Sequence, residues 1–327
     1  MNFMATAEQI KSLIRSHFAS QPERFYTIAF QVAAHEAKQG HIALAHDIRE
    51  IIDAERKKNG AKVLSFPQDL LGLVLTEQPE VSKVSLVVPE QLQNRINQII
   101  HEYRQQSKLK SHGLKHRRKI LLIGPPGTGK TMTAKVLAKE LHLALHTIQV
   151  DRVVTKFMGE SSAKLRQIFD LMQQEHGVYL FDEFDAIGGE RSNENDVGEM
   201  RRVLNAFLQF IEQDTSDSLI VAATNNPKLL DQALFRRFDD VLYYTAPDSS
   251  ERKRLIENIL GTFKENKLSW KTIVSKSEGL SHAEVDLACQ DAIKKAILSD
   301  TLKVSTASLL ESINNRQEAR RGMRGEY

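Results

Sequence analysis

The sequence predicts an α/β fold: a parallel β-sheet covered by helices, with further helical domains before and after it. Between residues 119 and 245, short apolar runs alternate with amphipathic helical patterns, which is typical of a parallel sheet. Helical patterns and a connector of mixed short patterns precede this region, and helical patterns follow Pro247. The predicted domains are a helical bundle (1–60), a connector (61–88), the α/β domain (89–246) and a helical domain with a basic tail (247–327).

The composition is that of a globular protein with more than one domain. The chain has 327 residues, 41% of them hydrophobic and 27% charged, and a net charge of +3. It shows no apolar run long enough to cross a bilayer and no signal-peptide pattern, so we expect a cytoplasmic protein without membrane contact. The basic residues at 108–119 and in the tail fit a solvated linker and chain end. The single cysteine, Cys289, excludes an internal disulfide framework, and its helical setting predicts a buried, inert thiol.

The first part of the chain has helical periodicity. Apolar residues recur at helical spacing in segments 5–20, 22–39 and 41–58, and Gly40 and Gly60 punctuate these segments. Segment 61–88 holds Pro67 and Pro79, is followed by Pro89 and shows mixed short patterns, so it is predicted as a connector. From residue 90 onward the stretch EQLQNRINQIIHEYRQ predicts a helix that leads into the α/β region.

The α/β region alternates strands with helices, and the last region is helical. Strands are predicted at 119–124, 144–150, 177–185, 218–225 and 239–245. Helices are predicted at 131–141, 161–176, 199–213, 249–262, 269–278, 281–299 and 305–320. In the helix at 161–176, Leu165, Ile168, Phe169 and Met172 recur at helical spacing and are expected to form one buried stripe.

Residues 124–131, GPPGTGKT, fit the phosphate-binding pattern G-x-x-x-x-G-K-[ST] between a predicted strand and a predicted helix. Its glycines let backbone N–H groups approach phosphate oxygens, and the helix N-terminus adds partial positive charge. Lys130 is expected to reach the β- and γ-phosphates of ATP, and the Thr131 hydroxyl to bind Mg²⁺. The predicted nucleotide-binding residues are Gly124, Pro125, Pro126, Gly127, Thr128, Gly129, Lys130, Thr131 and Met132.

Acidic residues end the predicted strand at 177–185. Buried strands rarely end in Asp-Glu without a cation nearby, because an isolated charge is costly to bury. We expect Asp182 to hold the Mg²⁺ through water and Glu183 to polarise the water that attacks the γ-phosphate. Asp185 is expected to cap a helix.

Two further polar groups follow along the chain. The strand at 218–225 ends in Asn225, whose amide is expected to orient the same attacking water. Eleven residues later, Arg236 and Arg237 stand together in LFRRFDD. They are expected to act as arginine fingers that reach the nucleotide of a neighbouring subunit, and the alternative is surface charge.

In this order and spacing, GPPGTGKT, VYLFDEFD, LIVAATN and LFRRFDD resemble the motifs of an AAA ATPase. The resemblance runs from about Pro89 to roughly Leu302, and the adjacent arginines resemble those of the katanin and spastin branch. It implies a homo-oligomeric ring, a hexamer, with ATP sites between subunits. It also implies that the helical domain from residue 246 onward is a lid over the nucleotide.

The lid stretch GLSHAEVDLA departs from the family pattern. Related proteins usually show Gly-Ala after the serine, whereas here Ser281 is followed by His282 and Ala283. The stretch also lacks the arginine that many relatives outside this branch carry. Two interpretations of His282 stay open, one near the adenine or ribose and one at a solvent-facing helix start.

The stretch TKFMGES, residues 155–161, resembles the pore loop of AAA protein translocases. Phe157 and Met158 lie off the buried stripe of the following helix, and we expect them to grip an extended polypeptide by non-directional packing. The alternative is burial in a local core. Residues 188–199 correspond to a second pore loop, where Arg191 either touches the substrate backbone or lies in a solvated loop.

These features predict an ATP-driven remodeller or unfoldase that threads protein substrates. A helical start followed by one AAA module also resembles small bacterial AAA ATPases encoded beside a subtilisin-like serine protease, some of which act in defence against phages or plasmids. The chain has no H-E-x-x-H and no G-x-S-x-G, so any protease would be a separate partner chain. The alternatives are a nucleic-acid motor or loader, which would need a basic pore, and a switch or scaffold ring that threads nothing.

Overall fold

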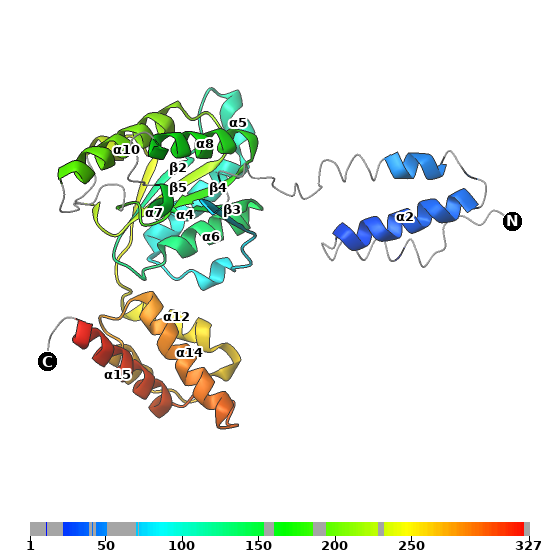
Figure 1. Ribbon diagram of the computed structural model, residues 1–327. Helices are drawn as coiled ribbons and strands as arrows, with labels where there is room; N and C mark the ends of the chain where they lie inside the picture. The colour runs from blue at the N-terminus through cyan, green and yellow to red at the C-terminus, as the bar shows by residue number, and fades with distance from the viewer. Residues whose placement is uncertain are drawn as a thin grey trace. The chain divides into compact units, whose positions relative to one another are not determined.

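The computed structural model describes residues 22–38, 44–50, 72–153, 160–185, 194–227 and 232–323, together with Lys11, His41 and Leu70. The chain divides into two compact units, Met1–Asp69 and Leu70–Tyr327. The second unit contains a β-sheet with helices on both faces and a separate group of helices that ends the chain (Figure 1).

The described part of the first unit is helical. Helix α2 (Pro22–Lys38) begins at a proline, which fits the first helical position because its missing N–H has no partner there. Its buried face carries Ala29, Val32 and Ala33. Residues 44–50 are also helical, which agrees with part of the helix predicted at 41–58. The helix predicted at 5–20 lies outside the described residues, apart from Lys11.

The sheet of the second unit has six strands in the order β1-β3-β4-β5-β2-β6. Strand β1 is antiparallel to β3, and the other described pairs are parallel. The strands are β1 (Val74–Glu77), β2 (Lys119–Ile123), β3 (Ala144–Ile148), β4 (Gly177–Phe181), β5 (Leu219–Thr224) and β6 (Asp240–Tyr243). The predicted α/β class is therefore confirmed.

Helices cover both faces of this sheet, which is why its central strands are buried along their whole length (Figure 1). On one face lie α4 (Glu90–Arg104) and α6 (Lys130–Leu141), whose apolar residues share a core with Val178 and Leu180 of β4. On the other face lie α8 (Glu160–Gln174) and α10 (Glu194–Gln213). There the ring of Phe181 packs on Phe169 and Phe207, with centroids 6.2 and 5.1 Å away.

The short elements of the α/β part connect these layers. They are α5 (Gln106–Ser111), α7 (Val150–Val153) and α11 (Gln232–Phe235). The stripe predicted on the helix at 161–176 is buried, since Leu165, Ile168 and Met172 are fully inaccessible and Phe169 is 6% exposed. Helical periodicity therefore identified the packed face of α8 correctly.

The last region forms a separate helical core, which we call the lid. It contains α12 (Ser249–Leu260), η4 (Gly261–Phe263), α13 (Trp270–Lys276), α14 (His282–Leu298) and α15 (Thr306–Met323). Cys289 is completely buried in this core, and burial raises the pKa of its thiol to about 12. The thiol is therefore protonated at neutral pH, as the sequence predicts for an inert cysteine.

The segment predicted as a connector contributes to the sheet. Residues 74–77 form the edge strand β1, and Gln149 donates a backbone hydrogen bond to Leu73. Further on, η2 (Lys83–Ser85) leads into residues 86–88. The apolar pattern of residues 61–88 is too short and too interrupted by proline to show this strand from periodicity alone.

Residues 83–88 form a strap between the α/β part and the lid. Leu86 and Val88 pack in the core beneath the sheet, whereas Val87 between them packs in the lid core. Arg254 on α12 donates to the carbonyl of Val88, with Nη2 and O 3.0 Å apart. The strap therefore joins the two cores through consecutive residues.

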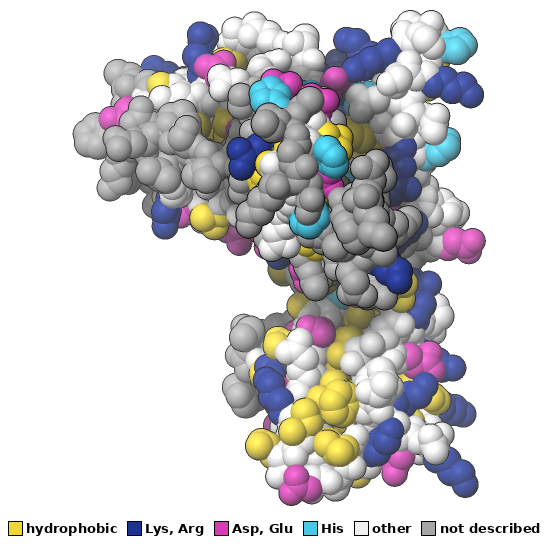
Figure 2. Space-filling model, turned by 90° about the vertical axis from the view of Figure 1, so that its right-hand side faces the viewer, with side chains coloured by type: hydrophobic (Ala, Val, Ile, Leu, Met, Phe, Trp, Pro, Cys, Tyr) yellow, Lys and Arg dark blue, Asp and Glu magenta, His cyan; other side chains and the backbone are white. Residues whose placement is uncertain are grey.

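The visible surface is mixed in character. In Figure 2, Lys and Arg side chains are scattered over the visible surface, and hydrophobic side chains gather on the visible face of the lid. Exposed large apolar residues of the lid include Leu287, Ile297, Leu298 and Leu302. Within the described ranges, no helix combines the length and apolar character that crossing a membrane requires.

Candidate functional site

The carboxyl ends of three neighbouring strands define the candidate site. Strand β5 lies between β2 and β4, and all three are parallel, so their carboxyl ends meet at one edge. The loop GPPGTGKT follows β2, Asp182 follows β4, and Asn225 follows β5. Open α/β sheets bind ligands at this edge, because the loops that leave the strands there converge.

Glycine is required at the first position of the phosphate-binding loop. Gly124 has φ of +157°, and a Cβ placed there would lie 2.4 Å from the carbonyl oxygen of Tyr244. This close approach joins the loop to the end of β6. The hydroxyl of Tyr244 in turn donates to Thr133 Oγ1 on α6, at 2.7 Å, so the loop is anchored before and after its turn.

Lys130 is buried within the loop, at 6% exposure. Its Nζ donates to the carbonyls of Gly124 and Pro125 at 2.7 and 2.9 Å, and to Asn225 Oδ1 at 2.7 Å. Burial lowers the pKa of Lys130, and the carboxylates of Asp182 and Asp185 oppose that shift. The ammonium group is thus held by oxygen acceptors where a phosphate oxygen could replace them.

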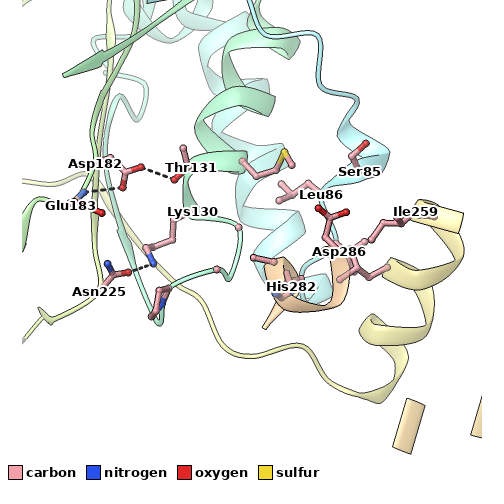
Figure 3. A pocket seen from close by; sticks show the side chains of 18 residues that line it. Ser85, Leu86, Lys130, Thr131, Asp182, Glu183, Asn225, Ile259, His282 and Asp286 are labelled. Atoms are coloured by element: carbon pink, nitrogen blue, oxygen red, sulfur yellow. Dashed lines mark hydrogen bonds between the residues drawn. The ribbon is translucent and has the colours of Figure 1, made fainter. Parts of the chain in front are cut away.

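A hydroxyl and a carboxylate, those of Thr131 and Asp182, meet beside Lys130. The Thr131 hydroxyl donates to Asp182 Oδ2 at 2.7 Å, and the backbone N–H of Glu183 donates to Asp182 Oδ1 at 2.9 Å (Figure 3). A hydroxyl and a carboxylate are the ligand types that Mg²⁺ prefers. The donor set therefore fits that ion, as the sequence analysis expects.

Glu183 has an unusual backbone. Its φ is +50°, in the left-handed region that non-glycine residues rarely adopt, and its side chain is exposed. Such conformations concentrate at functional sites, where the surrounding structure holds them in place. Phe184, the next residue, is fully buried and donates its N–H to the carbonyl of Ala223 at 2.8 Å, which fixes the turn.

Asp185 connects the loop that follows β4 to the loop that follows β5. Its Oδ1 accepts a hydrogen bond from the backbone N–H of Asn225 at 3.3 Å. The sequence predicts a helix cap at this position, and the bond to the end of another strand has no signature in the sequence. The contact positions Asn225, whose side chain accepts from Lys130.

A cavity of about 560 Å³ joins the loop, the strap and the lid (Figure 3). This volume is in the range of small-molecule sites. One end is polar and holds Lys130, Thr131 and Asp182. The rest of the lining comes from the strap, α12 and α14 and includes Ser85, Leu86, Val87, Leu255, Asn258, Ile259, His282, Ala283 and Asp286.

The lid touches the loop directly. The backbone N–H of Ala283, near the start of α14, donates to the carbonyl of Gly127 at 3.0 Å. A capping box fixes this helix start, since Ser281 N donates to Glu284 Oε2 at 2.6 Å and Glu284 N donates to Ser281 Oγ at 3.3 Å. Gly127 has φ of +72°, and a Cβ there would lie 2.9 Å from Ser281 Oγ.

His282 lines the cavity and does not face open solvent. Burial lowers the pKa of His282, and the neighbouring backbone of Val87 opposes the shift. Both ring nitrogens are buried without a hydrogen bond among the described residues. Of the two interpretations left open by the sequence, the location beside a bound nucleotide is the one that this placement favours.

The predicted arginine fingers lie away from this cavity. Arg236 is exposed after α11, and Arg237 forms an ion pair with Glu212 on α10, with Nη2 and Oε2 3.4 Å apart. Neither lines the cavity of its own chain. The predicted pore residues Phe157 and Met158, and Arg191 of the second loop, lie outside the described residues.

Sequence reasoning found the polar end of the site and missed most of the opposite end. The motif residues that line the cavity are Pro126, Gly127, Gly129, Lys130, Thr131, Met132, Asp182, Glu183 and Asn225. Gly124, Pro125 and Thr128 shape the loop, as when Thr128 Oγ1 donates to the carbonyl of Pro125 at 2.8 Å. Leu86, Ile259 and Asp286 were missed because each sits in an ordinary helical or loop pattern that carries no motif.

The fold and the site together define a P-loop nucleotide-binding protein, in which the phosphate loop, the acidic strand end and a helical lid enclose one cavity. Residues 120–246 match the family described as "ATPase family associated with various cellular activities (AAA)". The uncharacterized AAA family ATPase y4kL of Sinorhizobium fredii is 30% identical over 98% of each chain. The chain therefore belongs to the AAA family of ATPases, binds ATP and hydrolyses it.

Other relatives match over part of their length. Meiotic spindle formation protein mei-1 of Caenorhabditis elegans is 35% identical over 53% of this chain and 38% of its own. The proteasome-activating nucleotidase of Saccharolobus solfataricus is 33% identical over 64% of this chain and 56% of its own. This chain thus spans about half or less of these two relatives.

Proposed function

We propose that this chain is an ATP-driven protein remodeller or unfoldase that works as a homo-oligomeric ring, a hexamer. The observation that carries the proposal is the cavity that joins the phosphate loop, the acidic end of β4, Asn225 and the lid. The likeness to mei-1 and to a proteasome-activating nucleotidase supports proteins as the substrate class.

In this proposal, the phosphate end of the cavity binds ATP. Lys130 exchanges its loop carbonyls and Asn225 for oxygens of the β- and γ-phosphates. Thr131 and Asp182 would hold Mg²⁺, which offsets the negative charge of the phosphates when bound. Glu183 polarises the attacking water and accepts its proton, and Asn225 orients that water.

Hydrolysis would drive substrate movement through the ring. Phe157 and Met158, which resemble the pore residues of protein translocases, would hold the substrate chain by apolar contact. Arg236 and Arg237 would complete the ATP site of the neighbouring subunit, which is consistent with their position outside the cavity of their own chain. The unit Met1–Asp69 would dock the substrate or a partner.

The central test separates hydrolysis from threading. Glu183→Gln should bind ATP as the wild type does and lower the hydrolysis rate by about 100-fold or more, because the general base is lost. Phe157→Ala should retain ATP hydrolysis and lose unfolding of a fluorescent protein substrate. Phosphate release and loss of fluorescence measure the two steps. Glu257→Gln on α12, outside the cavity, is the control.

If Phe157→Ala unfolds the fluorescent substrate at the wild-type rate while Glu183→Gln loses that activity completely, a switch or scaffold ring is favoured over threading. Stimulation of the ATPase by DNA that weakens as salt rises would favour a nucleic-acid motor. Either result contradicts the proposed threading of proteins.

A separate partner chain would supply any proteolysis. We propose a subtilisin-like serine protease in this role, acting with the ring in bacterial defence against phages or plasmids. The resemblance of the helical start and single ATPase module to such pairs supports it. Trapping substrates and partners on Glu183→Gln with ATP in cells, and identifying them by mass spectrometry, tests the assignment. A trap that holds proteins but never a protease contradicts it.

A further inference from the structure

The lid end of the nucleotide cavity carries an acidic side chain that the phosphate chemistry does not use. Asp286 lies on α14, one helical turn after His282, and lines the cavity. In Figure 3 it lies with Leu86 and Ile259, on the opposite side from Lys130, Thr131 and Asp182. Its position therefore separates it from the groups that would hold phosphates.

The location of this carboxylate restricts what it can bind. The triphosphate of a nucleotide is strongly negative, so it would repel a carboxylate beside it. The surroundings of Asp286 at this end are largely apolar and include Leu86, Leu255 and Ile259, which suit the faces of a planar base. The base of the nucleotide is therefore the part that can lie beside Asp286.

The carboxylate has capacity for a further donor. Gln290 Nε2 donates to Asp286 Oδ2 at 2.8 Å, and the other oxygen has no hydrogen bond among the described residues. Burial raises the pKa of Asp286, because the apolar surroundings disfavour the charged form. A donor from the ligand would offset that desolvation, since hydrogen bonds to charged groups are the stronger ones.

We propose that Asp286 determines the base selectivity of this ATPase by accepting a hydrogen bond from the exocyclic 6-amino group of adenine. An ionised carboxylate only accepts hydrogen bonds. A purine with an oxygen at position 6, bound in the same orientation, would place an acceptor against an acceptor. The carboxylate of Asp286 and the oxygen at position 6 would then both lack a hydrogen-bond donor. Such a mismatch lowers the affinity for the wrong base more than the mere absence of a contact would.

The neighbouring polar groups leave this role to Asp286. Asn258 is held by a hydrogen bond from its Nδ2 to the carbonyl of Val84 at 2.9 Å, and its neutral amide oxygen is a weaker acceptor than a carboxylate. The ring nitrogens of His282 are covered by protein atoms, so they do not reach into the cavity in this conformation. The inference rests on the proposed placement of ATP in this cavity.

The test compares three nucleotides that differ at position 6 of the purine. Displacement of a fluorescent ATP analogue should give ATP an affinity about tenfold or more above that of inosine triphosphate and of purine riboside triphosphate, which lacks the amino group. Asp286→Ala should reduce both preferences to within about twofold. Asp286→Asn, whose amide can also donate, should bind inosine triphosphate at least as well as ATP.

Asp291→Asn, on the same helix and outside the cavity, is the matched control and should keep the wild-type preferences. Circular dichroism and thermal unfolding of each variant confirm folding. Unchanged preferences in both folded Asp286 variants would overturn the inference.

Lys130→Ala separates the failure of this inference from that of the proposed site. If Lys130→Ala binds ATP as tightly as the wild type, the placement of the nucleotide is wrong. If Lys130→Ala loses binding while the Asp286 variants keep the wild-type preference, the placement stands and only the role of Asp286 is wrong.

Discussion

His146 is a titratable residue of the sheet that does not line the cavity. His146 on β3 is 1% exposed, and its ring stacks on Tyr179 with centroids 4.5 Å apart. Its Nδ1 lies 2.9 Å from Thr76 Oγ1 of the edge strand β1. Gly177 faces the ring so closely that a Cβ there would lie 2.5 Å from it. The imidazole is thus packed on several sides.

Burial of this ring makes the stability of the sheet depend on pH. Burial lowers the pKa of His146 from 6.5 to about 4. As the pH falls below 6.5 the unfolded chain gains a proton that the folded chain does not, so stability is lost between about pH 6.5 and pH 4. Between pH 7 and pH 5 the wild type should lose on the order of 1–2 kcal/mol more free energy of unfolding than His146→Phe.

Urea unfolding at the two pH values measures this difference. Phenylalanine keeps the stacking on Tyr179 and removes the titrating group. His101→Phe, which replaces an exposed ring on α4, is the control and should lose stability as the wild type does. Equal losses in the wild type and His146→Phe would show that His146 does not contribute.

Sequence reasoning was most successful for residues whose chemistry is tied to fixed spacing. The motif loop, Asp182, Glu183 and Asn225 all lie at the cavity, because the ends of three adjacent parallel strands bring them there. The sequence patterns did not identify Asp286 or Ile259, because the positions of these two residues depend on how the lid packs against the loop. Nor could it show that Glu183 adopts φ of +50°, because a backbone angle of this kind has no signature in a glutamate.

At the scale of elements, the start of α14 connects the lid to the phosphate loop. Ser281 caps this helix through its hydroxyl, and Ala283 donates to Gly127. Ser269 precedes α13 in the same domain, but its side chain makes no capping bond. The two serines therefore offer a matched comparison of a cap with a simple helix start.

Ser281→Ala should lower the stability of the lid by about 1 kcal/mol, because the N–H of Glu284 loses its acceptor. Ser269→Ala should change it by less than about 0.5 kcal/mol. Thermal unfolding followed by circular dichroism measures both. The cap is unimportant for the lid if the two variants unfold at the same temperature.

Element types were predicted well and their junctions less so. The strand predicted at 177–185 ends at Phe181 in β4, because Asp182 and Glu183 turn away from the sheet. The helix predicted at 199–213 begins five residues earlier, at Glu194 in α10. Polar residues at helix starts weaken the apolar period, so pattern alone places such boundaries poorly. Strand β1 was not predicted. It pairs with β3, which is about 70 residues later in the chain, and periodicity does not reveal a partner at that distance.

At the scale of the whole molecule, the proposed function requires an ATP site completed by a neighbouring subunit. Lys130 lies in the cavity, whereas Arg236 and Arg237 do not. If the arginines act between subunits, a defect in one protomer can be complemented by another. Two variants that are each inactive in ATP hydrolysis can therefore form mixed rings that hydrolyse ATP.

Lys130→Ala and the double variant Arg236→Ala, Arg237→Ala should each lose nearly all ATP hydrolysis. In rings mixed at equal amounts, about a quarter of the interfaces would pair an intact Lys130 with intact arginines, so hydrolysis should recover to at most about a quarter of the wild-type rate. Phosphate release measures the recovery, and co-purification of two differently tagged variants verifies mixing. Verified mixed rings without recovery would contradict the shared site.

The strap at residues 83–88 limits how the lid can move. Its alternate residues are fixed in two different cores, Leu86 and Val88 under the sheet and Val87 in the lid. Pulling the lid straight off would expose an apolar side chain to water, whereas tilting it about Val87 keeps all three buried. We therefore expect the strap to act as a pivot, so that opening for ADP release is a rotation about a point at the wall of the cavity itself.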